Sequence, residues 1–468
     1  MAHSKQARSA RVASGAGALA LAAIIALGGA LPASAAPNID PAALGSITIH
    51  KFEEPATASG LANDGTEVDT SGLTPLAGVE FTVQQVTDID LTTDEGWALA
   101  AETDAAEAAA MNLGPAASVA TDGAGTAAFA DLPVGVYLVT ETDPGANDIA
   151  IASQPFLVSI PLPLDGDWLY DVHVYPKNSV TAIEKSVDES AALGLGSAVS
   201  WTVTAEVPEI AADASLTSFI IGDTLDSRLA YVGATVTATG VTLDAADYVV
   251  TEDGQQITVT FTAAGLAKLA AADGATVSVV IDTTVETLGD GIITNEAQLW
   301  VNDPTMSEDT GFTSTPVTTE WGTISILKHQ AGDETAVLAG AEFQVFASEA
   351  DALARTNPVA VAGETTFVTG ADGIAFVPGL VVGEYWIVET RAPAGYQIDQ
   401  TPVAVTVVAG DVTQASVDVS IANTQVPAYT LPLTGGEGQT AFVVGGAGLL
   451  LLAVGFALVR RRKAAAQA

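Results

Sequence analysis

Lysine is the residue type whose spacing in this chain most suggests chemistry. Only five lysines lie between Ala36 and Thr434, in a chain with 56 Asp+Glu, so lysine is not used there for general solubility. One of them, Lys177, directly follows Pro176 at the end of the strand-like stretch WLYDVHVYPKN, residues 168–178. An uncharged lysine amine is a nucleophile, whereas the ammonium has no lone pair with which to attack. Proline fixes φ and removes a backbone donor, so it would present this lysine from a stiff edge. The alternative interpretation is a charged lysine at the end of a strand.

Three other lysines lie early in their segments, on strand-like stretches flanked by apolar residues. They are Lys51 in SITIHKFE, Lys185 in AIEKSV and Lys328 in TISILKHQ. Burial in an apolar core disfavours the ammonium and lowers the pKa of a lysine, which leaves a neutral amine. The alternative is a side chain whose stem packs while its head reaches water. The fifth, Lys268 in AAGLAKLAA, is interpreted as a surface lysine of a helix or turn.

Composition favours an exposed, all-β protein. The 468 residues leave room for about three domains of ordinary size. The interior is rich in Val, Thr, Ala and Gly, with alternating apolar and polar positions, which favours strands and sandwich-like domains. A net charge of −41 excludes nucleic acid as a partner. Because there is no cysteine, disulfides cannot stabilise the chain, and the acidic composition suits a solvated surface protein.

The N-terminus has the three parts of a secretory signal peptide. Lys5, Arg8 and Arg11 precede an apolar stretch, which is followed by Ala33-Ser34-Ala35. Glycines and a proline interrupt the apolar part, so a transmembrane anchor is the weaker interpretation. Cleavage is predicted after Ala35, and the protein is predicted to be exported.

The C-terminus combines an apolar span with a short motif. Residues 441–459 are nineteen uncharged, apolar residues, enough to cross a bilayer, and a basic stretch, 460–463, follows them. The motif LPLTG lies just upstream, formed by Leu431, Pro432, Leu433, Thr434 and Gly435. Motif, span and basic tail in this order resemble the cell-wall sorting signal of Gram-positive surface proteins. The resemblance implies that a sortase cleaves between Thr434 and Gly435, holds Thr434 as a thioester and passes it to an amine. The span would then be a temporary anchor.

An internal repeat indicates two copies of one module. PLAGVEFTV (75–83) matches VLAGAEFQV (337–345), and GVYLVTET (135–142) matches GEYWIVET (383–390). The segment between them does not share this pattern. The Thr/Ser/Pro-rich segment 310–322 is predicted to form a last strand of the middle module and a linker.

Two longer motifs extend the resemblance to nearly the whole chain. YWIVETRAPAGY (385–396) is similar to the E-box of Gram-positive pilins, with Ile387 in the leucine position, and WLYDVHVYPKN is similar to their pilin motif. The chain thus resembles sortase-assembled major pilins. This implies three tandem immunoglobulin-like β-sandwich modules, of the collagen-adhesin B-type, A-type and B-type. The predicted segments are a signal peptide (1–35), an N-terminal module (36–178), a middle module (179–320), a C-terminal module (321–429) and the sorting signal with its helix and tail (430–468).

The resemblance assigns roles to the scarce lysines. Lys177 corresponds to the acceptor whose amine attacks the sortase-held Thr434 of another subunit. The other three correspond to lysines that form an isopeptide bond with an asparagine on the last strand of their module, promoted by a buried acid and needing no cofactor. The implied sets are Lys185, Asn295 and Asp223; Lys328, Asn423 and Glu389; and Lys51, Asn178 and Glu141. The last set is the least complete match, because YLVTETDPG lacks the end of the E-box.

The resemblance also implies partners and a location, and it leaves alternatives. The partners would be identical subunits, a class C pilin sortase, a housekeeping sortase and peptidoglycan, with minor pilins as further candidates. The location would be the cell wall and pilus surface, reached through a membrane-anchored precursor. An unpolymerised wall-anchored adhesin shares every feature except the pilin motif. A secreted enzyme is disfavoured, because His50, His173 and His329 each stand alone in a strand and no catalytic motif is present. Without a D-x-D-x-D-G array, no metal site is predicted.

Overall fold

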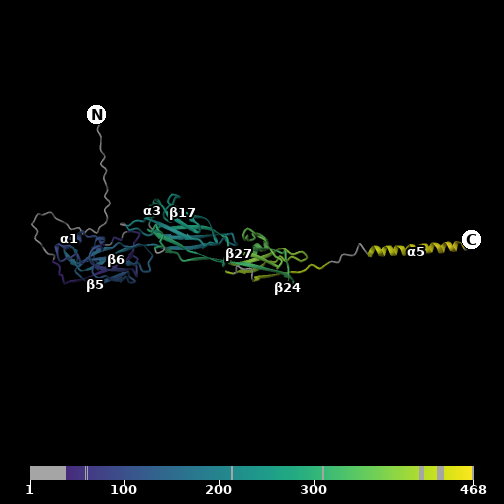
Figure 1. Cartoon of the computed structure of the whole chain (residues 1–468), viewed down its shortest axis with the longest axis horizontal. Coiled ribbons are helices and arrows are strands. Elements are labelled where there is room, and N and C mark those ends of the chain that lie inside the picture. The colour runs from purple at the N-terminus through teal and green to yellow at the C-terminus, as the bar shows by residue number, and fades with distance from the viewer. Residues whose placement is uncertain are drawn as a thin grey trace, which may run out of the picture.

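The computed structural model describes residues 38–465, apart from 58, 61, 212–213, 273, 308–309, 411–415 and 429–436. The alternating apolar residues form strands that pack as three β-sandwich modules, and the modules follow one another along the long axis of the molecule (Figure 1). Each module has its own buried apolar cluster. The predicted all-β fold class is confirmed. The predicted signal peptide and the LPLTG motif lie outside the described residues.

Two main sheets enclose the core of the first module. One sheet has the order β11–β1–β5, with β1 (Leu44–His50), β5 (Thr126–Pro133) and β11 (Asp171–Val174). The other has the order β4–β3–β6–β8, with β3 (Glu80–Gln85), β4 (Ala117–Ala120), β6 (Gly135–Asp143) and β8 (Phe156–Ile160). Ile47, Phe81 and Val139 come from the two sheets and are fully buried, so the core lies between them.

Shorter elements complete the first module. β2 (Phe52–Glu53), β12 (Lys177–Val180) and β7 (Ile149–Ile151) form a ladder in the order β2–β12–β7, and β9 (Leu162–Leu164) pairs with β10 (Asp167–Leu169). Helices α1 (Asp94–Glu102) and α2 (Ala105–Ala109) connect β3 to β4. Each helix begins at a capping side chain, Thr93 or Asp104, which accepts a backbone N–H that would otherwise lack a partner.

The middle module packs a four-stranded sheet against a five-stranded one. The first has the order β13–β14–β19–β16, with β13 (Ile183–Asp188), β14 (Ala198–Glu206), β16 (Leu229–Ala238) and β19 (Thr276–Val285). The second has the order β17–β18–β15–β21–β22, with β15 (Phe219–Thr224), β17 (Tyr248–Asp253), β18 (Gln256–Phe261), β21 (Ala297–Val301) and β22 (Phe312–Thr313). Helix α3 (Ala263–Leu269) follows β18, and Lys268 lies on it as predicted, paired with Asp244 and Asp247.

The third module is built on one long strand. β23 (Val317–Gln330) pairs with β24 (Asp333–Val337), β27 (Ile374–Val381) and, in parallel, β30 (Val419–Asn423). The other sheet has the order β26–β25–β28–β29, with β25 (Glu342–Phe346), β26 (Phe367–Val368), β28 (Gly383–Arg391) and β29 (Val403–Val407). Helix α4 (Glu349–Ala354) follows β25.

Of the last strand and linker expected at 310–322, the strand is confirmed by β22, and the linker is wrong because β23 belongs to two modules. Its residues 317–320 pair with β20 (Ile292–Asn295) of the middle module, and its residues from Trp321 onward pair with β27 of the third. The Thr/Ser/Pro-rich composition predicted a linker, but the β-branched residues Val317, Thr318 and Thr319 favour the extended chain. Because residues 317–320 and the residues from Trp321 onward each have a partner strand, β23 continues as one strand across the boundary between the two modules.

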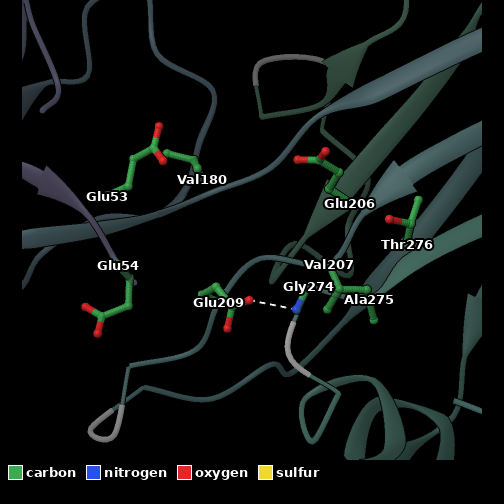
Figure 2. Close-up of a pocket in the computed structure, with 9 residues that line it drawn as sticks. All are labelled: Glu53, Glu54, Val180, Glu206, Val207, Glu209, Gly274, Ala275 and Thr276. Carbon is green, nitrogen blue, oxygen red and sulfur yellow. Dashed lines mark hydrogen bonds between the residues drawn. The ribbon is translucent and has the colours of Figure 1, made fainter. Parts of the chain in front are cut away.

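Side-chain and backbone contacts join neighbouring modules. Leu195 of the middle module donates its N–H to the carbonyl of Gly379 in the third (3.0 Å) and accepts one from Ala362 (2.6 Å). Thr181, which connects the first two modules, donates its N–H to the carbonyl of Asp148 in the first (3.1 Å) and its hydroxyl to the carbonyl of Glu206 in the middle module (2.6 Å). A pocket at this junction is rimmed by glutamates, including Glu209, which accepts the backbone N–H of Gly274 at 2.7 Å (Figure 2).

One long helix follows the modules. α5 (Glu437–Ala465) is drawn in yellow at the C-terminal end (Figure 1). Its segment Phe442–Arg462 is long and apolar enough to cross a membrane, by length and composition. It overlaps the span predicted at 441–459, and its large apolar side chains are exposed.

Trp321 offers a test of the shared strand. Its ring is fully buried in the core of the middle module, and its Nε1 donates to Thr319 Oγ1 at 2.9 Å. Because a large cavity would remain, Trp321→Ala should lower the free energy of unfolding of the middle module by about 3–5 kcal/mol. Calorimetry on the ectodomain would measure this. Val382→Ala, at a side chain 39% exposed, is the control. Equal transitions for the two variants would contradict the assignment of Trp321 to this core.

Candidate functional site

The three early lysines are buried, each near the start of its module. Lys51 directly follows β1, Lys185 lies in β13 and Lys328 lies in β23. Their exposed fractions are 0%, 8% and 0%. Long charged side chains are seldom buried to this extent unless they are paired. The interpretation of a packed stem with its head in water is therefore wrong for all three.

In the first module the predicted Lys51, Glu141 and Asn178 meet in one hydrogen-bonded group. Lys51 Nζ lies 2.9 Å from Glu141 Oε2 and donates to Asn178 Oδ1. Asn178 Nδ2 donates to Glu141 Oε1 at 2.7 Å. The acid comes from β6, and the asparagine comes from β12, which runs parallel to β2 just after the lysine. This set, the weakest match by motif, has the most hydrogen bonds of the three.

The middle module brings together Lys185, Asp223 and Asn295. Lys185 Nζ forms an ion pair with Asp223 Oδ2 in which both side chains are almost fully buried. Asn295 ends β20 beside this pair, but neither of its amide atoms has a well-formed hydrogen bond with a described residue. Burial raises the pKa of Asp223, and its contacts with Lys185 and Asn295 oppose that rise.

The third module repeats the arrangement with Lys328, Glu389 and Asn423. Lys328 Nζ lies 3.3 Å from Glu389 Oε1. Asn423 Nδ2 donates to Glu389 Oε2 at 2.8 Å and to the carbonyl of Gln397 at 2.7 Å. β23 and β30 are parallel neighbours, which brings the lysine and the asparagine to the same part of the core.

Burial makes these lysines unusually able to lose a proton. It lowers the pKa of Lys51 from 10.5 to about 8, although the nearby Glu141 carboxylate opposes this shift. Burial also lowers the pKa of Lys185 and of Lys328, against the opposing effects of Asp223 and Glu389. Each site thus holds a nucleophilic amine, a carboxamide and an acid in one apolar core. Aminolysis of the amide, with loss of ammonia, is the chemistry such a group can perform.

Each lysine also faces an aromatic ring that the sequence interpretation did not include. Lys51 Nζ lies 5.5 Å from the centre of the Phe81 ring, and Lys185 and Lys328 lie 5.7 Å from Trp201 and Phe343. A ring face excludes water and attracts a cation. Phe81 and Phe343 occupy the same position in the repeated stretches EFTV and EFQV. The internal repeat was therefore a signal that could have identified two of the three.

Lys177, the predicted acceptor, is less buried than the three lysines described above. It is the first residue of β12, pairs with Phe52, and is half-buried. No hydrogen bond or ion pair joins its amine to any residue in the described part of the chain. Since successive strand residues point to opposite faces, Asn178 enters the core while Lys177 faces outward.

The rest of the WLYDVHVYPKN stretch holds this strand in place. Val172 is buried in the core, and the Tyr175 hydroxyl accepts the N–H of Val68 at 2.9 Å. His50 lies beside His173 and Tyr175, with ring centres 5.3 and 4.9 Å away, and its Nε2 is 2.9 Å from His173 Nδ1. Burial, together with His173, lowers the pKa of His50. The expectation that His50 and His173 each stand alone is thus wrong in space, because β1 and β11 are parallel neighbours.

Four family models match successive parts of the chain. They are described as Gram-positive pilin subunit D1, N-terminal domain (residues 43–179), Sgo0707 N2 domain (180–320), prealbumin-like fold domain (322–424) and LPXTG cell wall anchor motif (428–465).

Full-length relatives are also similar. A fimbrial subunit type 2 from Actinomyces naeslundii is 36% identical and covers 96% of both chains. A fimbrial subunit type 1 from Actinomyces viscosus is 30% identical, over 94% of this chain and 95% of its own. Among solved structures, the major pilin SpaD from Corynebacterium diphtheriae matches with a TM-score of 0.72 at 29% identity, over 84% of this chain and 99% of its own. The major pilin SpaA from the same organism matches with a TM-score of 0.58 at 28% identity, over 81% of this chain and 100% of its own.

The lowered pKa of Lys51 predicts a pH dependence of stability. Between pH 8 and 10.5 the unfolded lysine binds more protons than the folded one, so the free energy of unfolding rises with pH in this window. In Asn178→Ala, where no bond to residue 178 can form, the first module should gain roughly 2–3 kcal/mol between these pH values. Denaturant unfolding followed across this range measures the gain.

A second variant isolates the contribution of this one amine. Lys51→Met added to Asn178→Ala removes only the buried amine and keeps every other titrating group. Its stability should show a correspondingly smaller rise. If the free energy of unfolding of both variants rose equally with pH, the lowered pKa of Lys51 would be contradicted.

Proposed function

The chain belongs to the sortase-assembled Gram-positive major pilins. We propose how the subunits of this pilus are joined. The chain is a structural shaft subunit of a pilus, anchored to the cell wall through an LPXTG motif. We propose that a class C sortase links the carbonyl of Thr434 in one subunit to Nζ of Lys177 in the next. The resulting polymer is then attached to peptidoglycan by a housekeeping sortase.

One observation carries the proposal for the acceptor. In a chain with 56 Asp+Glu, the amine of Lys177 has no carboxylate partner among the described residues, whereas Lys268, which is also half-buried, pairs with two. An amine held in an ion pair must leave its carboxylate partner before it can reach an acyl group, whereas an unpaired amine need not. The backbone beneath it is ordered by pairing with β2. Lys177 therefore combines a fixed position with an available nitrogen.

The transfer reaction balances without any further reactant. The neutral Nζ of Lys177 attacks the thioester carbonyl of Thr434, the C–N bond forms, and the sortase thiolate leaves and takes up the proton that the amine loses. Gly435 and the residues after it, including α5, have already been released by the first cleavage. The membrane helix then no longer belongs to the assembled subunit.

Within each module we propose a second type of covalent bond, between the buried lysine and its asparagine. The support is the proximity of amine, amide and acid, and the lowered pKa of all three lysines. Six buried polar atoms of the middle and third sites lack hydrogen-bond partners in the described residues. Such atoms are costly in the uncrosslinked chain, and amide formation with loss of ammonia removes part of that cost.

These bonds would replace the disulfides that the chain lacks. Lys51 and Asn178 are 127 residues apart in sequence. By the chain-entropy account of loop closure, a crosslink of this span stabilises the folded module by about 5 kcal/mol. It also joins an early strand to the last strand, so tension can pass through a covalent bond.

An unpolymerised, wall-anchored adhesin is the second candidate function. It would share the modules, the internal bonds and the sorting signal, but it would not need an available amine at residue 177. The Lys177 substitutions below distinguish it from the polymerised subunit.

Lys177→Arg and Lys177→Ala should both abolish covalent polymers. Arginine keeps the charge but is no nucleophile at physiological pH, so an ion-pairing role would tolerate it and an acyl-acceptor role would not. Immunoblots of cell-wall extracts should show ladders for the wild type and monomers for both variants. Lys268→Arg, on the surface of α3, is the control and should polymerise normally. Ladders from Lys177→Arg would refute the acceptor role.

The internal bonds predict a mass deficit. The mature ectodomain, purified without sortase, should be lighter than its sequence mass by one ammonia for each of three bonds. Asp223→Ala, Glu389→Ala and Glu141→Ala should each restore one ammonia and lower the thermal stability of their module, because the promoting acid is lost. Intact-mass spectrometry would measure this, and an unmodified wild-type mass would disprove it.

A further inference from the structure

The first module contains a fourth polar residue that the other two sites do not match. Ser153 lies between β7 and β8, and its backbone N–H donates to Asn178 Oδ1 at 2.7 Å. Its hydroxyl accepts from Lys51 Nζ at 3.0 Å and donates to Glu141 Oε2 at 2.9 Å. Ser153 thus contacts all three groups of the site.

The fold brings Ser153 to this position for a definite reason. β7 pairs with β12, and Ile151 is the register partner of Ser179, the residue after Asn178. The chain leaving β7 therefore passes directly beside the Asn178 side chain. The pairing that holds the last strand of the module also delivers Ser153 to the carboxamide.

The backbone N–H of Ser153 determines which way the amide of Asn178 points. A backbone N–H can only donate, so the Asn178 atom that faces it must be the oxygen. Nδ2 then faces Glu141, to which it donates. The amide is oriented with its oxygen toward donors and its leaving nitrogen toward the acid.

We propose that Ser153 is a catalytic residue in formation of the Lys51–Asn178 bond, which rests on the internal crosslinks proposed above. Its N–H stabilises the negative charge that develops on Asn178 Oδ1, as an oxyanion-hole donor does. Its hydroxyl, bonded to both the amine and the acid, provides a route for the proton that leaves Lys51.

Formation of the Lys51–Asn178 amide needs no reactant beyond these groups. The Lys51 ammonium gives one proton to Glu141, and the neutral Nζ attacks Cγ of Asn178, forming the C–N bond and placing negative charge on Oδ1. Glu141 then gives its proton to Nδ2 while a second proton passes from Nζ to Glu141, directly or through the Ser153 hydroxyl. The Cγ–Nδ2 bond breaks, ammonia leaves and Glu141 remains protonated.

The other two sites lack this donor on the carbonyl. Asn295 Oδ1 and Asn423 Oδ1 have no hydrogen-bond partner among the described residues. In the third module the nearby backbone N–H, from Asp399, donates to the acid instead, at Glu389 Oε2 (3.1 Å). Ser153 should therefore affect the first crosslink alone, which makes the other two internal controls in the same molecule.

The test follows the formation of each crosslink in the mature chain, from residue 36 on. Cell-free synthesis with detergent for the C-terminal helix, quenched at intervals, gives samples for digestion and mass spectrometry of the three crosslinked peptides. Ser153→Ala removes the hydroxyl, Ser153→Thr retains one, and Ser71→Ala, in an exposed loop, is the matched control. Replacing Ser153 by its α-hydroxy acid analogue keeps the hydroxyl and removes only the backbone N–H.

We expect the ester analogue to slow the Lys51–Asn178 bond about 100-fold, the effect of losing one oxyanion donor. Ser153→Ala should slow it about tenfold, less than a full loss of acid–base catalysis, because Glu141 still contacts the amine directly. Ser153→Thr should restore most of the rate, and Ser71→Ala should match the wild type. The middle and third crosslinks should form at the wild-type rate in every variant.

Three results would overturn the role of Ser153. Wild-type rates in both the alanine variant and the ester analogue would show that neither group acts. Equal slowing of all three crosslinks would reveal a folding defect. Absence of the Lys51–Asn178 bond from the wild type would remove the reaction itself, and that failure would belong to the proposed internal crosslink of the first module.

Discussion

The burial of three lysine amines in apolar cores is the constraint on which this structure depends. An ammonium taken out of water is strongly destabilised unless it is paired, and each of these lysines has one carboxylate within reach. The same desolvation that costs stability lowers the pKa of the amine. The packing that forms each β-sandwich core therefore also favours a neutral amine within it. An aromatic ring beside each amine helps to keep water out.

Much of this arrangement could be predicted from the sequence because the relevant residues are rare. With so few lysines, those in strand-like, apolar stretches stood out, and motif positions identified an acid and an asparagine for each. All three sets are brought together in the structure. However, how completely a site matches its sequence motif did not predict how many hydrogen bonds its residues form. Glu141 lacks the usual E-box end, yet its site has more hydrogen bonds than the sites of Asp223 and Glu389.

What could not be predicted depends on pairing between distant strands. Ser153 carries no sequence signal, because its role comes from the register of β7 on β12 and partly from a backbone N–H that any residue but proline has. The contact between the His50 and His173 rings likewise requires the parallel pairing of β1 with β11. The segment 310–322 was predicted to be a last strand followed by a linker, but two partner strands keep the chain from Val317 onward extended as well. Local sequence describes each strand, and only the sheet determines its neighbours.

The strand shared by two modules has a consequence for the bending of the molecule. β23 crosses from the middle to the third module without a break, so a change of angle there must strain paired backbone on both sides of Trp321. Residues 181 and 182, which connect the first two modules, belong to no strand. The second joint of the rod is thus a continuous paired strand, whereas the first is made of residues outside any strand that are held by hydrogen bonds to both modules. In a filament of such rods, bending would concentrate at the joint that has no continuous strand, close to Lys177, the residue proposed to accept the next subunit.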